Sequence, residues 1–354
     1  MSASVLPPTA EEQLAFLAKL QRLFAEGDFA ATYKFALLIS LADLAVEVGS
    51  DDGAELTLTN RQIAERFIQL YWRHAIPYGT GRAGTQPGVL VQNLGAQAAV
   101  LTAIGEFRAS VPGITIQRAR TEPRYATLLS KVASIVSAQP LNYLQNFGGV
   151  TDTFLYVRSS RGAITLGHGV AYCLRRFYTL VQQLSRTHWV DHIKGNRRNH
   201  AILGDAGDLE DFLFSLSRQS IAIVGAELRK LDGSRCFYCG CAIAEFDVDH
   251  FVPFSLYPRD QIHNLVLAHP ACNRSKSDTL AARPHLDRWL ERLATKSDAL
   301  YEIGAVAGVA NDRTTANRVA AWGYAAASAA GGRAWLSASN YEPVTASYLR
   351  LLDA

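Results

Sequence analysis

Four of the five cysteines of this 354-residue chain lie between residues 236 and 272, and this cluster constrains the fold more than any other feature of the sequence. Cys236 and Cys239 form a Cys-x-x-Cys pair, and His269 and Cys272 form a His-x-x-Cys pair further along. Two such pairs allow four nitrogen and sulfur ligands to close a tetrahedron around zinc. The spacing therefore predicts a structural zinc site, with Cys241 as a rival ligand. The alternative is a set of buried free cysteines beside an unrelated histidine.

A second set of polar residues is interleaved with the zinc motif. The segment around Asp247, Asp249 and His250 alternates as a strand does, which predicts both carboxylates on one face and His250 on the other unless the strand is distorted. Asn273 follows the last cysteine, at the start of a short helix expected over residues 271–280. Carboxylate and amide oxygens suit Mg²⁺ or Mn²⁺, and a neutral histidine accepts a proton from water at physiological pH. We expect the zinc site to hold this helix against the strand and so assemble a second metal site.

Over residues 235–278 the chain resembles the HNH, or ββα-metal, nucleases. The strings Val-Asp-His-x-Val-Pro and Asn-Arg-x-Lys-Ser-Asp are also similar to the HNH domain of RNA-guided CRISPR effector nucleases. The resemblance is specific because the zinc pairs and the polar residues keep their mutual register. It rests on the two zinc pairs and on Asp249-His250, Pro253, Asn264-Leu265 and Cys272-Asn273-x-x-Lys276.

The resemblance implies hydrolysis of phosphodiester bonds with one catalytic metal ion. Asp249 and Asn273 would hold Mg²⁺ or Mn²⁺ against the scissile phosphate, and His250 would activate the attacking water. Asn264 would tie the loop between the strands and keep His250 oriented. His269 stands where many members of the family have cysteine, and it is a competent ligand for the structural Zn²⁺.

Positive charge gathers in two places. The net charge of the whole chain is only +3, too weak to indicate nucleic-acid binding by itself. Between residues 158 and 200, however, basic residues far outnumber acidic ones, and the start of the helix expected after the last cysteine is also basic. Both places could meet phosphate groups, and a solvated surface is the alternative in each. The candidate contacts are Lys194, Arg197, Arg198, Arg274 and Lys276.

Elsewhere the apolar residues recur at helical spacing, so we predict an α+β chain that is mainly α-helical. Capping boxes at Thr9 and Thr59 open two of the expected helices, and the second is a packed domain helix or a helix-turn-helix element. We also expect strands over 153–157 and 163–166, and one helix over 209–231. The predicted domains are a helical N-terminal domain over 1–150, a mixed and helical basic region over 151–231, an HNH nuclease domain over 232–285, and C-terminal helices over 286–354 that pack on the rest.

The composition excludes several classes of protein. Apolar residues make up 49% of the chain and charged residues 19%, which argues against intrinsic disorder. The longest strongly apolar stretch is far shorter than the 18 to 20 or so residues of a membrane helix, and the first residues lack the basic and apolar regions of a secretory signal. We therefore expect a cytoplasmic protein that does not engage a membrane.

Together these features predict a metal-dependent HNH endonuclease that acts on DNA, double-stranded in the first instance, with RNA as the alternative. One active site would nick one strand at a time. The resemblance suits a bacterial restriction or anti-phage defence nuclease, with other proteins of a defence system as candidate partners. The alternative is a zinc-stapled nucleic-acid-binding or regulatory module whose nuclease needs a partner protein.

Overall fold

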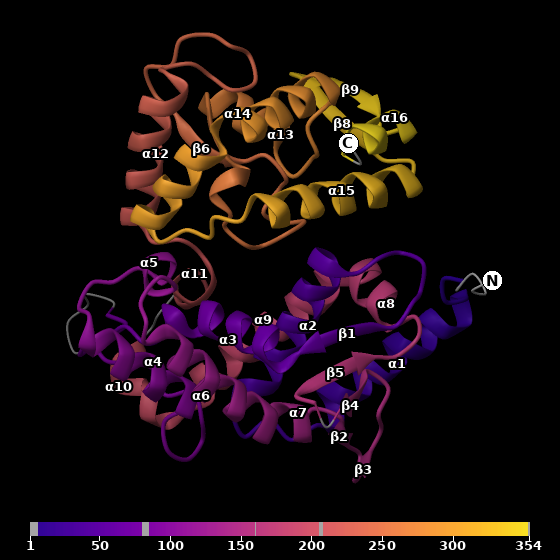
Figure 1. The fold of residues 1–354 in the computed structure, drawn as a ribbon, viewed down its shortest axis with the longest axis vertical. Helices are drawn as coiled ribbons and strands as arrows, with labels where there is room; N and C mark the ends of the chain where they lie inside the picture. Colours follow the sequence, from indigo (N-terminus) through magenta and orange to yellow (C-terminus); the bar gives the residue numbers. More distant parts are fainter. Residues whose placement is uncertain (1–5, 80–84, 160, 205–207, 353–354) are drawn as a thin grey trace. The chain divides into compact units, whose positions relative to one another are not determined.

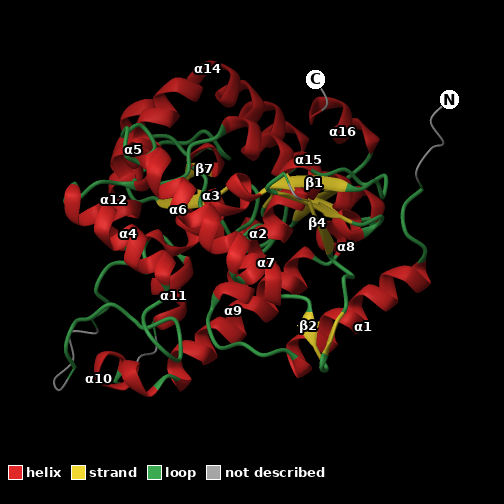
Figure 2. Cartoon of the chain, turned by 60° about the horizontal axis from the view of Figure 1, so that its bottom comes forward, coloured by secondary structure: helices red, strands yellow, loops and turns green. Residues whose placement is uncertain are grey.

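The computed structural model describes residues 6–79, 85–159, 161–204 and 208–352. Helices predominate among these residues and the strands form small sheets, which confirms the α+β, mainly α-helical fold (Figure 2). The chain divides into two compact units: unit 1 is Met1–Gly113 and Glu122–Leu213, and unit 2 is Ile114–Thr121 and Phe214–Ala354. The division into four domains stays a prediction. Within the described ranges, no helix is both long and apolar enough to cross a membrane.

Unit 1 is built around one buried helix. Every residue of α2 from Tyr33 to Glu47 is buried, and α2 packs against α3, α7, α8 and α9 (Figure 1). This agrees with a helix that is apolar nearly all round. The helices of unit 1 are α1 (Ala10–Glu26), α2 (Tyr33–Val48), α3 (Asn60–Trp72), α4 (Ala99–Ser110), α6 (Tyr125–Ala138), α7 (Pro140–Tyr143), α8 (Val170–Arg176), α9 (Tyr178–Gly195), η1 (Arg197–Asn199) and α10 (His200–Leu203), and α11 (Leu209–Phe214) ends at the border of the unit.

Both predicted capping boxes are present. The hydroxyl of Thr9 accepts a hydrogen bond from the Glu12 backbone N–H, and the hydroxyl of Thr59 accepts one from that of Gln62. Each cap satisfies a backbone donor that the first helical turn would leave unpaired. The helix opened by Thr59, α3, buries its apolar side chains against α2, α4 and α6. It is therefore a packed helix of unit 1.

The strands of unit 1 form an antiparallel sheet of order β1-β5-β4 and a separate β2-β3 hairpin. The first strand pairs with β5 and was not expected from the sequence, and the strand expected over 153–157 begins later. Gly148 and Gly149 turn the hairpin at φ of 59° and 76°, a left-handed conformation that favours glycine. The strands are β1 (Leu56–Thr59), β2 (Asn146–Phe147), β3 (Val150–Thr151), β4 (Tyr156–Ser159) and β5 (Ala163–Leu166).

Unit 2 surrounds a two-stranded antiparallel sheet with helices. Trp289 stacks on Phe251 with ring centroids 4.8 Å apart, and its indole N–H donates to the His263 carbonyl, which anchors α14 to the sheet. The elements of unit 2 are α5 (Ile116–Ala119), α12 (Arg218–Asp232), β6 (Asp247–His250), η2 (Ile262–Asn264), β7 (Leu265–Ala268), α13 (Pro270–Lys276), α14 (Arg283–Ala307), α15 (Arg313–Ala329), β8 (Arg333–Ser337), β9 (Asn340–Pro343) and α16 (Ala346–Leu352).

Two expectations about the helices were wrong. The single helix expected over 209–231 is broken into α11 and α12, because the hydroxyl of Ser217 caps a new helix by accepting from the Ser220 N–H. Near the carboxyl end, Gly331 at φ 66° stops α15, and the chain then forms the β8-β9 hairpin. Trp335 on β8 exchanges backbone hydrogen bonds with Leu280 and Ala282, so the hairpin packs beside the segment that follows α13.

Candidate active site

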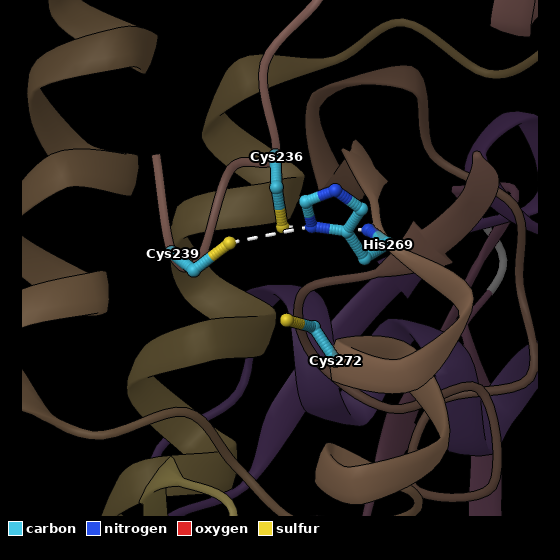
Figure 3. Close-up of side chains that lie close together, drawn as sticks. All are labelled: Cys236, Cys239, His269 and Cys272. Atoms are coloured by element: carbon cyan, nitrogen blue, oxygen red, sulfur yellow. Dashed lines mark hydrogen bonds between the residues drawn. The ribbon is translucent and has the colours of Figure 1, made fainter. Parts of the chain in front are cut away.

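Four of the predicted zinc ligands converge in unit 2. One donor atom from each of Cys236, Cys239, His269 and Cys272 lies within 4.8 Å of all the others (Figure 3). Donors that share a tetrahedral zinc ion at 2.0 to 2.3 Å lie about 3 to 4 Å apart, so small inward rotations of these side chains close the site. Three sulfurs and one imidazole are the donor chemistry that zinc prefers. The residues present fit a structural zinc ion.

The imidazole of His269 is already oriented for this task. Its Nε2 lies 3.0 Å from the Ala242 carbonyl, which leaves Nδ1 directed at the sulfur of Cys239, 3.3 Å away. A carbonyl that accepts the second ring proton fixes the tautomer that a metal needs. The rival ligand Cys241 does not belong to the cluster; it is exposed, and its Sγ lies 3.8 Å from the Cys239 carbonyl.

The cluster places a short helix against the sheet. Asp247 pairs with Ala268 and His250 with Leu265 in the regular antiparallel ladder of β6 and β7. His269 follows β7 directly and is the N-cap of α13. Cys272, on α13, lies close to Cys236 and Cys239. Strands β6 and β7 and helix α13 are thus the two strands and one helix that the resemblance implies, and the predicted zinc site lies where they join. Asn273 and Lys276 are carried by α13 toward β6.

The carboxylate of Asp249 is held by protein groups. Its Oδ2 accepts from the Tyr238 hydroxyl at 2.5 Å and lies 3.1 Å from the Lys276 ammonium, and Asp249 is only 7% exposed. Burial and the charge of Asp249 raise the pKa of Tyr238 well above its usual value, so the hydroxyl remains a donor. Burial lowers the pKa of Lys276, although the attraction of Asp249 opposes this. A metal ion bound at Asp249 has to share this carboxylate with Lys276 or displace its ammonium.

The imidazole of His250 has a carboxylate partner. Its Nε2 lies 2.7 Å from Oδ1 of Asp260, and both side chains are mostly buried. A carboxylate that accepts the Nε2 proton leaves Nδ1 as the basic nitrogen and fixes the ring plane. The ring also packs 5.1 Å from that of Phe254. His250 is therefore held in a defined orientation by Asp260.

The side chain of Asn264 closes the loop that follows β6. Its amide nitrogen donates to the Val252 carbonyl at 2.8 Å, and its amide oxygen accepts from the Val252 N–H at 2.7 Å. The Asn264 backbone carbonyl accepts from the Phe251 N–H as well. These contacts fix the segment directly after His250. Asn264 is thus placed to tie the loop, and its effect on His250 stays a prediction.

Asn273 lies nearer to Asp247 than the sequence alone suggested. Its amide nitrogen donates to Oδ2 of Asp247 at 3.1 Å, so the amide contacts the first carboxylate of β6. Both residues are partly exposed, whereas Asp249 is buried. The Asp247 carboxylate and the Asn273 amide oxygen are hard ligands of the kind that suits Mg²⁺ or Mn²⁺. Asp247 therefore joins Asp249 and Asn273 as a candidate ligand.

The candidate phosphate contacts differ in exposure. Lys276 is only 1% exposed, and its ammonium contacts Asp249 and the His250 carbonyl, so a phosphate contact would require it to leave them. Arg274 is exposed on α13. In unit 1, Lys194, Arg197 and Arg198 are exposed, and Arg198 donates to the Gly95 carbonyl. Their contacts with nucleic acid stay predictions.

The basic stretch over residues 158–200, which contains Lys194, Arg197 and Arg198, is only partly exposed to solvent. Trp189, which lies in this stretch, is fully buried, and its indole N–H donates to Gln92. Arg175 is buried as well, where it pairs with Asp51 and donates to carbonyls at the end of α2. Part of the local positive charge therefore stabilises the fold of unit 1.

Sequence reasoning missed two residues of the site. Tyr238 lies inside the Cys-x-x-Cys pair, so the knuckle that binds zinc also brings its hydroxyl to Asp249, and this position was a usable signal. Asp260 lies in the irregular segment between β6 and η2, and no spacing rule connects it with His250. Only the folded loop brings these two side chains together.

Two family models match the chain. One, described as HNH endonuclease, matches residues 236–282, which contain the zinc cluster, β6, β7 and α13. The other, described as domain of unknown function (DUF8808), matches residues 13–213, more than half of the chain. Searches of curated proteins and of solved structures found no match. The predicted HNH resemblance is confirmed, and it lies in the carboxyl-terminal part of the chain.

Proposed function

We propose that this chain is a metal-dependent endonuclease that hydrolyses phosphodiester bonds in DNA. The chain belongs to the DUF8808 family and carries an HNH endonuclease domain. The observation that carries the proposal is the junction of β6 and α13. Within the matched residues, Asp260 orients His250, the Asn273 amide contacts Asp247, and four potential zinc donors lie close together. On the strength of resemblance alone, the proposal extends to a bacterial restriction or anti-phage defence nuclease in the cytoplasm.

In this mechanism Asp249 and Asn273 would hold Mg²⁺ or Mn²⁺, and Asp247 would be available beside Asn273. The ion would supply a Lewis acid for the scissile phosphate and the leaving oxygen. The ammonium of Lys276 neutralises Asp249 before the ion binds, so the carboxylate is not a buried unpaired charge.

His250 acts as the general base. Asp260 accepts the proton of Nε2, so Nδ1 is free to take a proton from water while the ring remains fixed. Asp260 also stabilises the imidazolium that forms. One such centre per chain cuts one strand per encounter, so a nicked product precedes a linear one.

A second candidate function is supported by one contact. Because Tyr238 and Lys276 already hold Asp249, the isolated chain could rest in an inactive arrangement. It would then be a zinc-stapled nucleic-acid-binding or regulatory module, and its nuclease would need a partner protein to free that carboxylate.

The test is incubation of the full chain and its His250→Ala variant with supercoiled plasmid in Mg²⁺ or Mn²⁺. We expect the wild type to convert supercoiled into nicked plasmid, and the variant and an EDTA-treated sample to leave it intact. A matched control is His168→Ala, which removes an exposed histidine in unit 1. Full cleavage by His250→Ala contradicts the mechanism. Plasmid binding without cleavage by a zinc-loaded wild type supports the second candidate.

A further inference from the structure

An open groove of about 920 Å³ runs along β6 within unit 2. One wall is α12, which lies outside the residues matched by the HNH family model, and the other wall is β6 with the side chain of Asn273. Two candidate metal ligands, Asp247 and Asn273, therefore face this groove. The lining residues are Ile221, Ala222, Gly225, Ala226, Arg229, Lys230, Phe246, Asp247, Val248 and Asn273.

The residues that α12 contributes share one face of the helix. They recur at intervals of three and four positions, which is the spacing of a single helical face. Val224 and Leu228, on another face, are buried where α12 packs against α14 and the sheet. Gly225 lies against the Phe246 side chain, since a Cβ atom at this glycine would lie 2.7 Å from a carbon of the ring. Except at Gly225, the side chains of α12 that line the groove are exposed: Ile221, Ala222, Ala226, Arg229 and Lys230.

The groove combines an apolar wall with positive charge at one end. Ile221 is 43% exposed, and small side chains separate it from the cations. The guanidinium of Arg229 lies 5.9 Å from the centre of the Phe246 ring, and the Lys230 side chain is 72% exposed and paired only with Glu227 at the surface. Nε of Arg229 donates to the Ser234 hydroxyl at 2.8 Å, and an exposed ion pair such as that of Lys230 with Glu227 contributes little, so both cations can meet a ligand.

This combination distinguishes two forms of nucleic acid. A base-paired duplex keeps the faces of its bases stacked inside and presents phosphates and groove edges to a protein. A single strand exposes its bases, which pack on apolar and aromatic side chains while cations follow the phosphates. An exposed isoleucine and the ring of Phe246 beside Arg229 and Lys230 match the second arrangement.

We infer that the groove between α12 and β6 binds unpaired nucleotides of the DNA strand that is cut, with Arg229 and Lys230 on its phosphates and Ile221 and Phe246 under its bases. This inference rests on the proposed nuclease function, since it places the strand beside Asp247 and Asn273. It replaces the double-stranded substrate expected from the sequence by single-stranded or locally unpaired DNA.

The test measures binding and does not depend on cleavage. Fluorescence anisotropy with the full-length His250→Ala chain compares a labelled single strand with its duplex, in Mg²⁺. We expect the single strand to bind at least tenfold more tightly. Adding Arg229→Ala and Lys230→Ala should weaken that binding at least tenfold and reduce the slope of log K against log salt by about 1.4, which corresponds to two phosphate contacts.

Two further variants keep the test specific. Ile221→Asp, at an exposed position, should weaken binding of the single strand at least tenfold without lowering the melting temperature. The matched control for charge is Arg313→Ala with Arg318→Ala, two exposed arginines on α15, which should change affinity less than threefold. Equal or tighter binding of the duplex, or equal losses in the control and the groove variants, overturns the inference. Neither outcome bears on whether His250 is the base.

Discussion

A buried hydrogen-bond network of unit 1 and the cluster of metal donors in unit 2 are stabilised in different ways. In unit 1 the protein supplies the partners: the carboxylate of Asp43 accepts from Tyr178 and Gln182, and the amide oxygen of Gln92 accepts from Thr32 and Trp189. In unit 2 four metal donors converge on one another. The first arrangement is complete when the chain folds, whereas the second gains its energy when an ion binds. From this difference we expect the stability of unit 2 to depend on zinc and the stability of unit 1 to be independent of it.

The largest expected effect comes from removing zinc. The change Cys239→Ser, or a strong chelator, should remove on the order of 10 kcal/mol of folding free energy from unit 2, because structural zinc binding is folding free energy. Hydrogen exchange followed on peptides from each unit should show unit 2 unprotected and unit 1 unchanged.

The control for this experiment is Cys241→Ser, an exposed cysteine outside the cluster, which should keep both zinc and protection. If unit 2 stays protected without zinc, the contrast between the units is wrong.

A buried polar group should be the weak point of unit 1. Gln92→Leu removes the amide that accepts from the Thr32 hydroxyl and the Trp189 indole N–H and that contacts Nδ1 of His74, at a cost of about 1 to 3 kcal/mol. Chemical denaturation should show the loss in unit 1 alone. The exposed Gln183→Leu on α9 is the matched control and should change stability by less than about 0.5 kcal/mol.

Acid should weaken both units. Burial lowers the pKa of His74 in unit 1 and of His263 in unit 2 from 6.5 to about 4. Between pH 6.5 and 4 these histidines are protonated in the unfolded chain but not in the folded chain. The free energy of unfolding is therefore highest above pH 6.5 and falls as the pH drops toward 4, by up to about 3 kcal/mol per histidine.

The measurement is denaturation of each unit between pH 7 and 4. His74→Gln should flatten the pH dependence of unit 1 only, and His263→Gln that of unit 2 only. An unchanged slope in His74→Gln would show that other groups govern the acid sensitivity of unit 1. Unit 2 should remain the steeper of the two because protons compete with zinc for its ligands.

The smallest expected effect is the same in both units. Thr59→Ala removes the cap of α3 in unit 1, and Asp312→Ala removes the cap of α15 in unit 2, each at about 1 kcal/mol. Thermal denaturation of the zinc-loaded protein checks this. A loss of stability in only one of the two variants would mean that the contribution of a helix cap also depends on the unit that contains it.

The local features of the fold were predictable because they depend on neighbours in the sequence. The capping residues Thr9 and Thr59 and the pairs of zinc ligands were read from spacing alone. Features that depend on distant partners were not: β1 became a strand because β5 pairs with it, and Trp189 is buried because Gln92 accepts its N–H.

The candidate site shows the same division. The sequence by itself determined the candidate residues, because the spacing of the zinc donors and the order of Asp249, His250 and Asn273 can be read along the chain. Only the tertiary structure decided their partners: Asp260 for His250, Asp247 for Asn273, and Tyr238 with Lys276 for Asp249. The reason is physical, because a hydrogen bond depends on distances of about 3 Å between atoms, and loop conformation and helix packing set those distances.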